Sequence, residues 1–179
     1  MIQTSPITIQ PLQAEDLPAC VQVLTQNELW KQYSITQERA EHMLNQALQE
    51  GASILVAKID GQTTGFAWYS LHGAFHRSAY LRLIGVLPAW QGHHVGEALL
   101  KAAEDASAEH VQDMFLLVTH SNLSAQRFYQ RMGYQQVGAI PDYVVKGITE
   151  LIYQKRLFEK PRQPVKQPPN IQIKKAHIP

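Results

Sequence analysis

The loop that spans residues 88–96 has the composition of a phosphate-binding turn. An apolar strand stops at Pro88, and the segment Gln91-Gly-His-His-Val-Gly96 then leads into a helix. Such a loop leaves several backbone N–H groups unpaired at the positive end of a helix dipole, and both features favour phosphate. The loop matches neither the Walker pattern nor the G-x-G-x-x-G dinucleotide fingerprint. On its own it therefore also fits an ordinary strand-to-helix turn.

A second set of side chains that could take part in catalysis lies farther along the chain. Residues 122–134 read Asn-Leu-Ser-Ala-Gln-Arg-Phe-Tyr-Gln-Arg-Met-Gly-Tyr, which places Tyr129 on a predicted helix, and His120 ends the strand before it. Arg127 and Arg131 stand four residues apart on the same helix face, where they could reach phosphates or form a solvated surface.

Hydrophobic periodicity indicates the elements that hold these two motifs. Strand 80–87, helix 95–108 and strand 115–119 form a crossover unit, and the nearly all-apolar strand 115–119 is typical of burial on both faces. Strands 54–59 and 63–71 pair antiparallel around a turn at Asp60-Gly61. Further strands are expected at 7–12, 134–140 and 148–157, and further helices at 14–24, 36–49 and 121–132.

Size and composition indicate one folded domain, and the single cysteine fits a reducing compartment. The chain has 179 residues, of which 45% are hydrophobic and 17% charged, which argues against an intrinsically disordered chain. The longest apolar run, 114–118, is too short for a membrane span, and no basic residue precedes Lys31 to begin a signal peptide. The single cysteine, Cys20, recurs with apolar residues at helical spacing, so we expect a core position without a disulfide or a cysteine-based metal cluster. We therefore expect a cytoplasmic protein.

Residues 160–179 differ in composition from the rest of the chain. They hold five of the ten prolines and five basic residues without an acid. Because proline at this density blocks helices and central strands, we predict a domain at 1–159 and a proline-rich, basic, flexible tail at 160–179. Without the tail's five basic residues, 11 basic residues face 15 acidic ones, a net charge of −4. That charge makes nucleic acid an unexpected partner of the domain, although the tail could bind nucleic acid or an acidic protein.

The two motifs, taken in order, resemble those of the GNAT acetyltransferase superfamily. The segment from Gln91 to Gly96 resembles its pyrophosphate loop, Q/R-x-x-G-x-G/A, and residues 122–134 resemble its stretch N-x-x-A-x-x-F-Y-x-x-x-G-F/Y at nearly every position. His94 departs from the pattern because it replaces the first motif glycine, although histidine tolerates a positive φ better than most residues. The resemblance covers residues 6–158 as an arrangement of elements. It implies a mixed α/β fold, a twisted and mostly antiparallel sheet flanked by helices, with strands splayed at a central cofactor site.

The resemblance implies acetyl-CoA as a cosubstrate, and we expect no metal. The pantetheine arm would run along strand residues 83–86, and the pyrophosphate would lie on residues 91–96. Tyr129 matches the tyrosine that protonates the leaving thiolate as a general acid. The residues implied to bind the cofactor are Ile84, Gly85, Val86, Gln91, Gly92, His93, His94, Val95, Gly96, Asn122 and Ser124.

The resemblance does not assign the general base. Strand 80–87 lacks the carboxylate that members of the superfamily often carry there, so the role cannot be transferred. His72, His76, His120 and Glu150 are the candidates. We place His120 first, because it ends the strand beside the expected splay and an imidazole titrates near neutral pH. A surface role for His120 stays open.

These residues together predict an N-acetyltransferase that transfers acetyl from acetyl-CoA to a primary amine by direct attack. The expected acceptor is an amine of a small molecule or a protein, and we expect the loop 141–149 to lie beside it. We expect no membrane partner, and a homodimer is left open. Two other functions also stay open. His94 and the missing strand carboxylate fit an acetyl-CoA-binding regulatory protein without turnover, and the basic tail fits binding of a partner or of nucleic acid.

Overall fold

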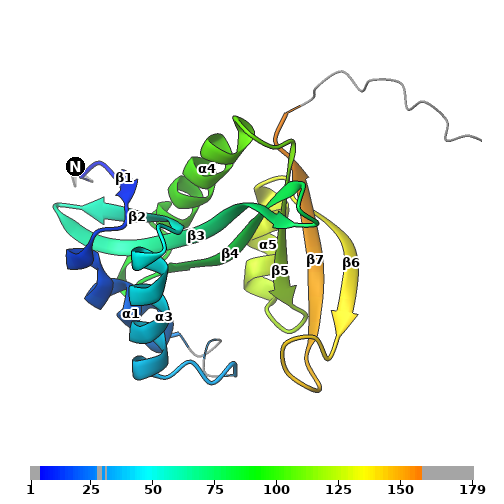
Figure 1. The fold of residues 1–179 in the computed structure, drawn as a ribbon, viewed down its shortest axis with the longest axis horizontal. Coiled ribbons are helices and arrows are strands. Elements are labelled where there is room, and N and C mark those ends of the chain that lie inside the picture. Colours follow the sequence, from blue (N-terminus) through cyan, green and yellow to red (C-terminus); the bar gives the residue numbers. More distant parts are fainter. Residues whose placement is uncertain (1–4, 28–29, 31, 159–179) are drawn as a thin grey trace, which may run out of the picture.

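Seven strands form one sheet in the computed structural model, which describes residues 5–27, 30 and 32–158 (Figure 1). Their order across the sheet is β1-β2-β3-β4-β5-β7-β6, and neighbouring strands are antiparallel except β4 and β5, which are parallel. The strands are β1 Thr8–Pro11, β2 Ser53–Ile59, β3 Gln62–Ala74, β4 Ser78–Val86, β5 Asp113–Thr119, β6 Gln135–Pro141 and β7 Thr149–Arg156. The helices are α1 Leu17–Thr25, α3 Gln37–Gln49, α4 Val95–Ala108 and α5 Leu123–Arg131, with 3₁₀ turns η1 Ala14–Asp16 and η2 Pro88–Trp90.

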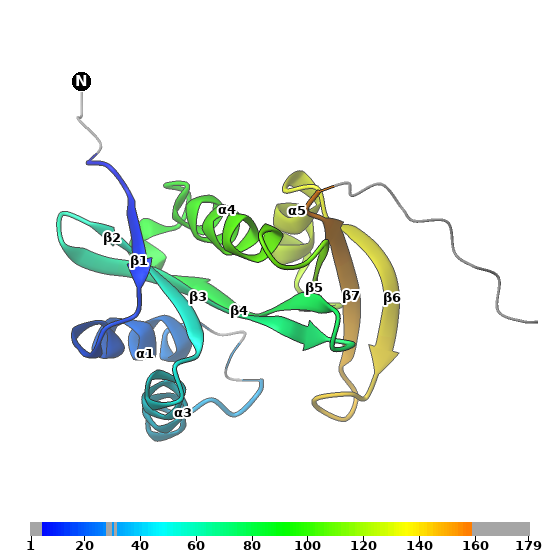
Figure 2. The ribbon, with the colours of Figure 1, turned by 45° about the horizontal axis from the view of Figure 1, so that its top comes forward.

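Helices cover both faces of the sheet (Figure 2). The helices α4 and α5 lie over one face, and α1 and α3 pack together on the other. Side chains alternate between the two faces of each strand, so the strands supply two apolar cores. Leu99 and Leu116 belong to the core under α4 and α5, whereas Leu24, Leu44 and Phe66 belong to the core under α1 and α3.

Local sequence signals fix the ends of the helices. Thr36 caps α3 by accepting the backbone N–H of Arg39 at 3.2 Å. Asn122 caps α5 in the same way, accepting the N–H of Ala125 at 3.1 Å. Gly133, with φ at +89°, follows the end of α5 and turns the chain into β6. The cap at Asn122 therefore starts α5 directly beyond the end of β5.

The sheet divides between β4 and β5. Only Ala79–Leu81 of β4 pair with Met114–Leu116 of β5. At the point where pairing stops, the β3–β4 register shifts and skips Arg82, which is a β-bulge. A bulge bends its strand, and Figure 1 shows β4 turning away from β5, so that β1–β4 run across the view and β5–β7 run down it. The β5-facing edge of residues 83–86 consequently has no partner strand.

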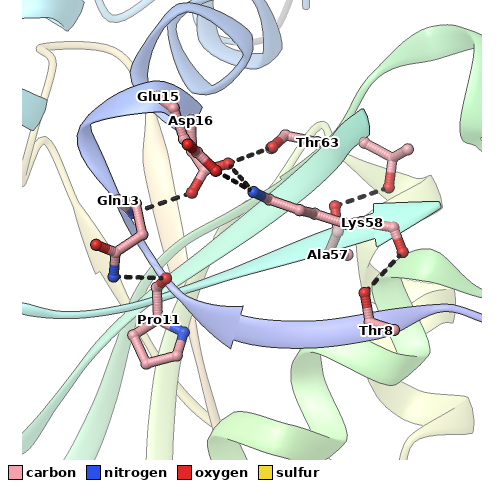
Figure 3. Close-up of polar contacts among 9 residues, drawn as sticks. Thr8, Pro11, Gln13, Glu15, Asp16, Ala57, Lys58 and Thr63 are labelled. Atoms are coloured by element: carbon pink, nitrogen blue, oxygen red, sulfur yellow. Dashed lines mark hydrogen bonds and ion pairs between the residues drawn. The ribbon is translucent and has the colours of Figure 1, made fainter. Parts of the chain in front are cut away.

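A buried ion pair attaches η1 to the β2–β3 hairpin (Figure 3). Asp16, which is 1% exposed, accepts hydrogen bonds from the Thr63 hydroxyl at 2.6 Å and the Gln13 backbone N–H at 2.9 Å, and it lies 2.9 Å from Nζ of Lys58. Glu15 contacts the same ammonium group at 2.9 Å. Burial opposes ionisation of Asp16, but the hydrogen bonds from Thr63 and Lys58 outweigh it and lower the pKa of Asp16. These contacts fix the start of α1 against the sheet.

The mixed α/β sheet expected from the sequence is confirmed, and its crossover unit is β4–α4–β5. Cys20 is fully buried, and burial raises the pKa of its thiol to about 12, which fits the predicted core position. The expectation that β5 is buried on both faces is wrong. Met114, Leu116 and Val118 are buried, whereas Leu117 is only half-buried, because its face of β5 borders the opening beside β4.

The sequence predicts a domain at 1–159 and a tail at 160–179, and the structure describes the chain as far as residue 158. The described strands form one sheet, and a single domain at 1–159 stays a prediction. The predicted tail, 160–179, lies outside the described residues. Within the described ranges, no helix combines the length and the apolar character that crossing a membrane requires.

Candidate active site

An open cleft of about 1370 Å³ lies where β4 and β5 separate. Its walls come from the α1–α3 side of the sheet, from β4 and β5, from the loop before α4 and from α5. The cleft therefore collects side chains from both faces of the sheet. Its volume exceeds the ~300–1,000 Å³ of ordinary small-molecule pockets, so a long ligand and a second molecule can share it.

One part of the cleft wall is formed by the start of α4. The first hydrogen bond of the helix runs from the N–H of Ala98 to the carbonyl of His94 at 3.0 Å, so the N–H groups of residues 95–97 have no acceptor within the helix. No side chain caps this end of α4. The free N–H groups and the helix dipole together favour an anion. Five of the residues for which the sequence resemblance implied cofactor binding line the cleft: Gln91, Gly92, His94, Val95 and Gly96.

His94 has the left-handed backbone conformation that its place in the motif suggested. Its φ is +61° and its ψ is 8°, and Gly92 nearby has φ at +82°. The His94 imidazole lies 2.9 Å from the carboxylate of Glu97 and therefore points along the helix surface. His94 therefore makes the same turn as a glycine would. The left-handed conformation costs a non-glycine residue roughly 1–2 kcal/mol of conformational free energy.

The free edge of β4 forms a second wall of the cleft. Ile84, Gly85 and Val86 line the cleft, and their backbone on this side has no neighbouring strand to pair with. A Cβ at Gly85 would lie 2.4 Å from Cγ1 of Val23, so a larger residue would displace α1 from the sheet. Unpaired N–H and C=O groups along an extended strand can hydrogen-bond an amide-containing chain laid beside them.

Helix α5 contributes polar and basic groups to the same cleft. Asn122 lines the cleft while its side-chain oxygen holds the N–H of Ala125, and the exposed Ser124 lies beside it. Arg127 and Arg131 line the cleft too. Their guanidinium groups can neutralise phosphate charge near the start of α4.

Tyr129 stands on α5, belongs to the core under α4 and α5, and also lines the cleft. The side chain is 7% exposed, and its ring lies 5.6 Å from that of Tyr134 and 6.5 Å from that of Tyr153. Burial and the nearby Tyr80 hydroxyl raise the pKa of Tyr129, so the phenol is protonated at neutral pH. Because Tyr129 lines the cleft, its phenol can act as a hydrogen-bond donor to a ligand there.

A buried carboxylate lies in the cleft at the ends of β5 and β7. Glu150 is 4% exposed, and its Oε1 accepts a hydrogen bond from the Tyr33 hydroxyl at 2.5 Å. The Tyr33 hydroxyl also contacts Oγ1 of Thr119, the residue opposite Glu150 in the β5–β7 register. Burial and the hydrogen bond to Glu150 raise the pKa of Tyr33 to about 12. Tyr33 and Thr119 were missed by sequence reasoning, because Tyr33 lies 86 and 117 residues away from its two partners.

The structure does not bring every predicted site residue into the cleft. Two residues, His93 and His120, are exposed and do not line it. The His93 ring packs edge-on against Trp90, and His120 contributes its backbone N–H to the carbonyl of Thr149 at 2.9 Å. Of the other base candidates, His72 lines a separate depression and His76 lies in the exposed turn between β3 and β4. Glu150 alone among the four candidates lines the cleft.

Comparison with known proteins agrees with this geometry. Residues 21–134 match the model of the Acetyltransferase (GNAT) family, so the chain belongs to that family, whose members use acetyl-CoA. A GNAT-family acetyltransferase from Bacillus cereus superimposes with a TM-score of 0.71 at 20% identity, covering 87% of this chain and 100% of that one. A Salmonella typhimurium protein solved with acetyl-CoA superimposes with a TM-score of 0.69 at 20% identity, covering 86% of this chain and 95% of that one.

A curated relative is similar over part of its length. Mycothiol acetyltransferase of Mycolicibacterium vanbaalenii is 27% identical over 130 residues, which is 66% of this chain and 40% of the relative. The chain therefore spans well under two thirds of that protein. The likeness supports the family and leaves the acceptor of this chain undefined.

Proposed function

We propose that the protein is an acetyl-CoA-dependent N-acetyltransferase that acetylates a primary amine, with Tyr129 as the general acid. One observation carries the proposal: the start of α4, the free edge of β4 and Tyr129 all line a single cleft. A molecule with a phosphate end, an amide-containing arm and a thioester meets a complementary group at each of these three places.

Binding is divided among three groups of the chain. The N–H groups of residues 95–97 bind the pyrophosphate, and Arg127 and Arg131 supply positive charge. The edge of residues 83–86 pairs with the pantetheine amides and aligns the thioester for attack. Ordering a thioester and an amine in one cleft replaces an encounter in solution, which is a large part of the acceleration expected of a direct transfer.

Tyr129 completes the reaction by protonating the sulfur. A thiolate is a tolerable leaving group, since a thiol has a pKa of ~8.5, but a proton delivered as the C–S bond breaks lowers the barrier further. The raised pKa of Tyr129 keeps the phenol protonated until that step. The amine attacks the carbonyl carbon, and no acyl-enzyme forms.

The phosphate part of the proposal is tested by Gly96→Asp. Acetyl-CoA at 100 times its Kd should stabilise the wild type by about 2.7 kcal/mol, seen as a rise in melting temperature. The aspartate places a carboxylate beside the pyrophosphate, so this rise should disappear although the free helix, with an acid in its first turn, stays stable. Gly96→Ala is the control, because a Cβ there lies 3.7 Å from Phe128 and 3.8 Å from Val86, which are ordinary contacts. Equal stabilisation of the aspartate variant and the wild type would remove the phosphate assignment.

Turnover is tested separately with a panel of amines. Release of free CoA is followed with amino acids, spermidine, an aminoglycoside and short peptides that carry a free N-terminus. At least one of them should be acetylated. Acetyl-CoA binding without turnover on every class would instead support the regulatory, binding-only function.

A further inference from the structure

We propose that Glu150 binds the acceptor as an ammonium ion and then accepts a proton from it. The acceptor is therefore a primary amine that is cationic in solution, and it enters the cleft from the α1–α3 face of the sheet. This inference rests on the proposed acetyl transfer and adds the side of approach, the charge of the acceptor and the base.

Glu150 and Tyr129 approach the cleft from opposite faces of the sheet. Val118 and Leu151 pack in the core that contains Tyr129, under α4 and α5. Side chains alternate along a strand, so the next residue of β5, Thr119, and the preceding residue of β7, Glu150, point to the other face. The cleft reaches both groups because β4 and β5 are separated there. An amine entering beside Glu150 therefore attacks from one face while the sulfur leaves beside Tyr129.

The surroundings of Glu150 fit an ammonium group. Among the described residues that line the cleft, the acids are Glu150, which is 4% exposed, and Glu97, which is only partly buried, in the first turn of α4. A carboxylate this buried is costly unless it is hydrogen-bonded or paired with a cation. Tyr33 satisfies Oε1, and no described residue bonds Oε2, which leaves one oxygen for the acceptor.

Aromatic side chains complete this acceptor side of the cleft. Tyr80 and Tyr33 line it together with Glu150. Burial raises the pKa of the Tyr80 phenol, and Tyr143 and Glu150 add to this rise while Arg82 opposes it. Tyrosine rings around a carboxylate favour a cation through both the ring faces and the charge. Val144, in the loop after β6, lines the same part and exposes apolar surface to the rest of the acceptor.

The proton movements balance with these two residues. The ammonium group gives one proton to the Glu150 carboxylate, and the neutral amine forms the C–N bond at the thioester carbonyl. The C–S bond then breaks, and the sulfur takes the Tyr129 proton. The product nitrogen returns a proton to the Tyr129 phenolate, and Glu150 releases its own to solvent. The sum is ammonium plus thioester giving amide, CoA thiol and one proton.

The test compares Glu150→Gln with the wild type on the panel amine that the wild type acetylates best. Glutamine keeps the shape but cannot take the proton, so kcat/KM should fall about 10²-fold or more, within the range of general base catalysis. The thermal shift given by acetyl-CoA should stay unchanged. Glu109→Gln, an identical change at an exposed position outside the cleft, should leave both values unchanged.

An O-alkylhydroxylamine analogue of the same amine separates the base from a merely structural role. Its nitrogen is neutral at neutral pH and needs no deprotonation, so Glu150→Gln should slow it far less than the alkylammonium substrate. Tyr33→Phe should show the same selective loss more weakly, as expected of a residue that positions the carboxylate. Equal losses on both nucleophiles, or no loss on either, would overturn the assignment. Absence of turnover by the wild type on every amine would instead overturn the proposed function on which it rests.

Discussion

At the level of single residues, the Tyr129 hydroxyl can be removed with little effect on packing. Tyr129→Phe keeps the ring contacts with Tyr134 and Tyr153 and removes only the hydroxyl. We expect the melting temperature and the acetyl-CoA affinity to change little. The kcat should fall about 10²-fold, because the sulfur must leave without a proton donor. Steady-state kinetics with a verified acceptor measure this.

Tyr134→Phe is the matched control for that variant. It makes the same chemical change one ring away, at a residue that is 2% exposed and does not line the cleft. Turnover should stay at the wild-type level. A fall in kcat of similar size in both variants would assign the effect to the aromatic cluster and remove the acid role of Tyr129.

The sequence motifs predicted residues that line one side of the cleft far better than those that line the other. Gln91, Gly96 and Tyr129 lie within short motifs whose spacing is set by local structure, so pattern alone placed them in one cleft. Glu150 and Tyr33 meet through the tertiary fold, 117 residues apart. No local pattern carries such a contact, which is why His120 was placed before Glu150 as the candidate base.

At the level of elements, the opening between β4 and β5 depends on cross-strand register. Alternation of apolar residues predicted both strands and their parallel crossover, but the bulge at Arg82 appears only when β3 is aligned with β4. The guanidinium group of Arg82 lies 4.4 Å from the centre of the Trp68 ring, so the bulged residue is held on the sheet surface. The half-buried Leu117 follows from the same opening. An apolar strand beside a cleft has the same composition as one buried on both faces, so composition alone could not separate them.

The contact between η1 and the β2–β3 hairpin gives a pH-dependent stability prediction. Asp16→Asn should lower the free energy of unfolding by about 1.5–3 kcal/mol, the usual range for hydrogen bonds to a charged group. The pKa of Asp16 is lower in the folded than in the unfolded state, so its ionised form stabilises the fold at neutral pH. That contribution is complete above about pH 5 and declines as the pH falls through the folded pKa, below about pH 4. Urea unfolding of both proteins across this range measures the difference.

Glu15→Gln provides the comparison at the same ammonium group. Glu15 contacts Lys58 at the same distance as Asp16, but its side chain is 73% exposed. An exposed pair contributes about 0–1 kcal/mol, so this variant should differ little from the wild type. A constant Asp16→Asn difference down to acid pH would show that the carboxylate charge contributes nothing to the contact.

At the level of the whole molecule, the two parts of the sheet are tied together away from the cleft. Lys155 of β7 lies 2.6 Å from Glu104 of α4, and Arg156 lies 3.1 Å from Asp113 at the start of β5. The first contact joins β7 to α4, which packs over β2–β4, and the second stays between β7 and β5. The cleft opens elsewhere, where the β4–β5 pairing stops. The arrangement keeps the sheet continuous and still leaves room for a ligand through its middle.

This architecture predicts that a chain ending at Phe158 keeps its fold and its cofactor site. The last residue in a strand is Arg156, and the N–H of Leu157 still bonds the carbonyl of Gln112 at 2.8 Å, so the sheet is complete by that point. No described group that lines the cleft lies beyond Glu150 in the sequence. The shortened chain should therefore match the full chain in melting temperature and in the thermal shift given by acetyl-CoA. The shortened chain loses five basic residues and Glu159, so 11 basic residues face 14 acidic ones, a net charge of −3, which should weaken any salt-dependent binding of nucleic acid seen with the full chain. A drop in melting temperature of several degrees would show instead that residues 159–179 pack against the sheet.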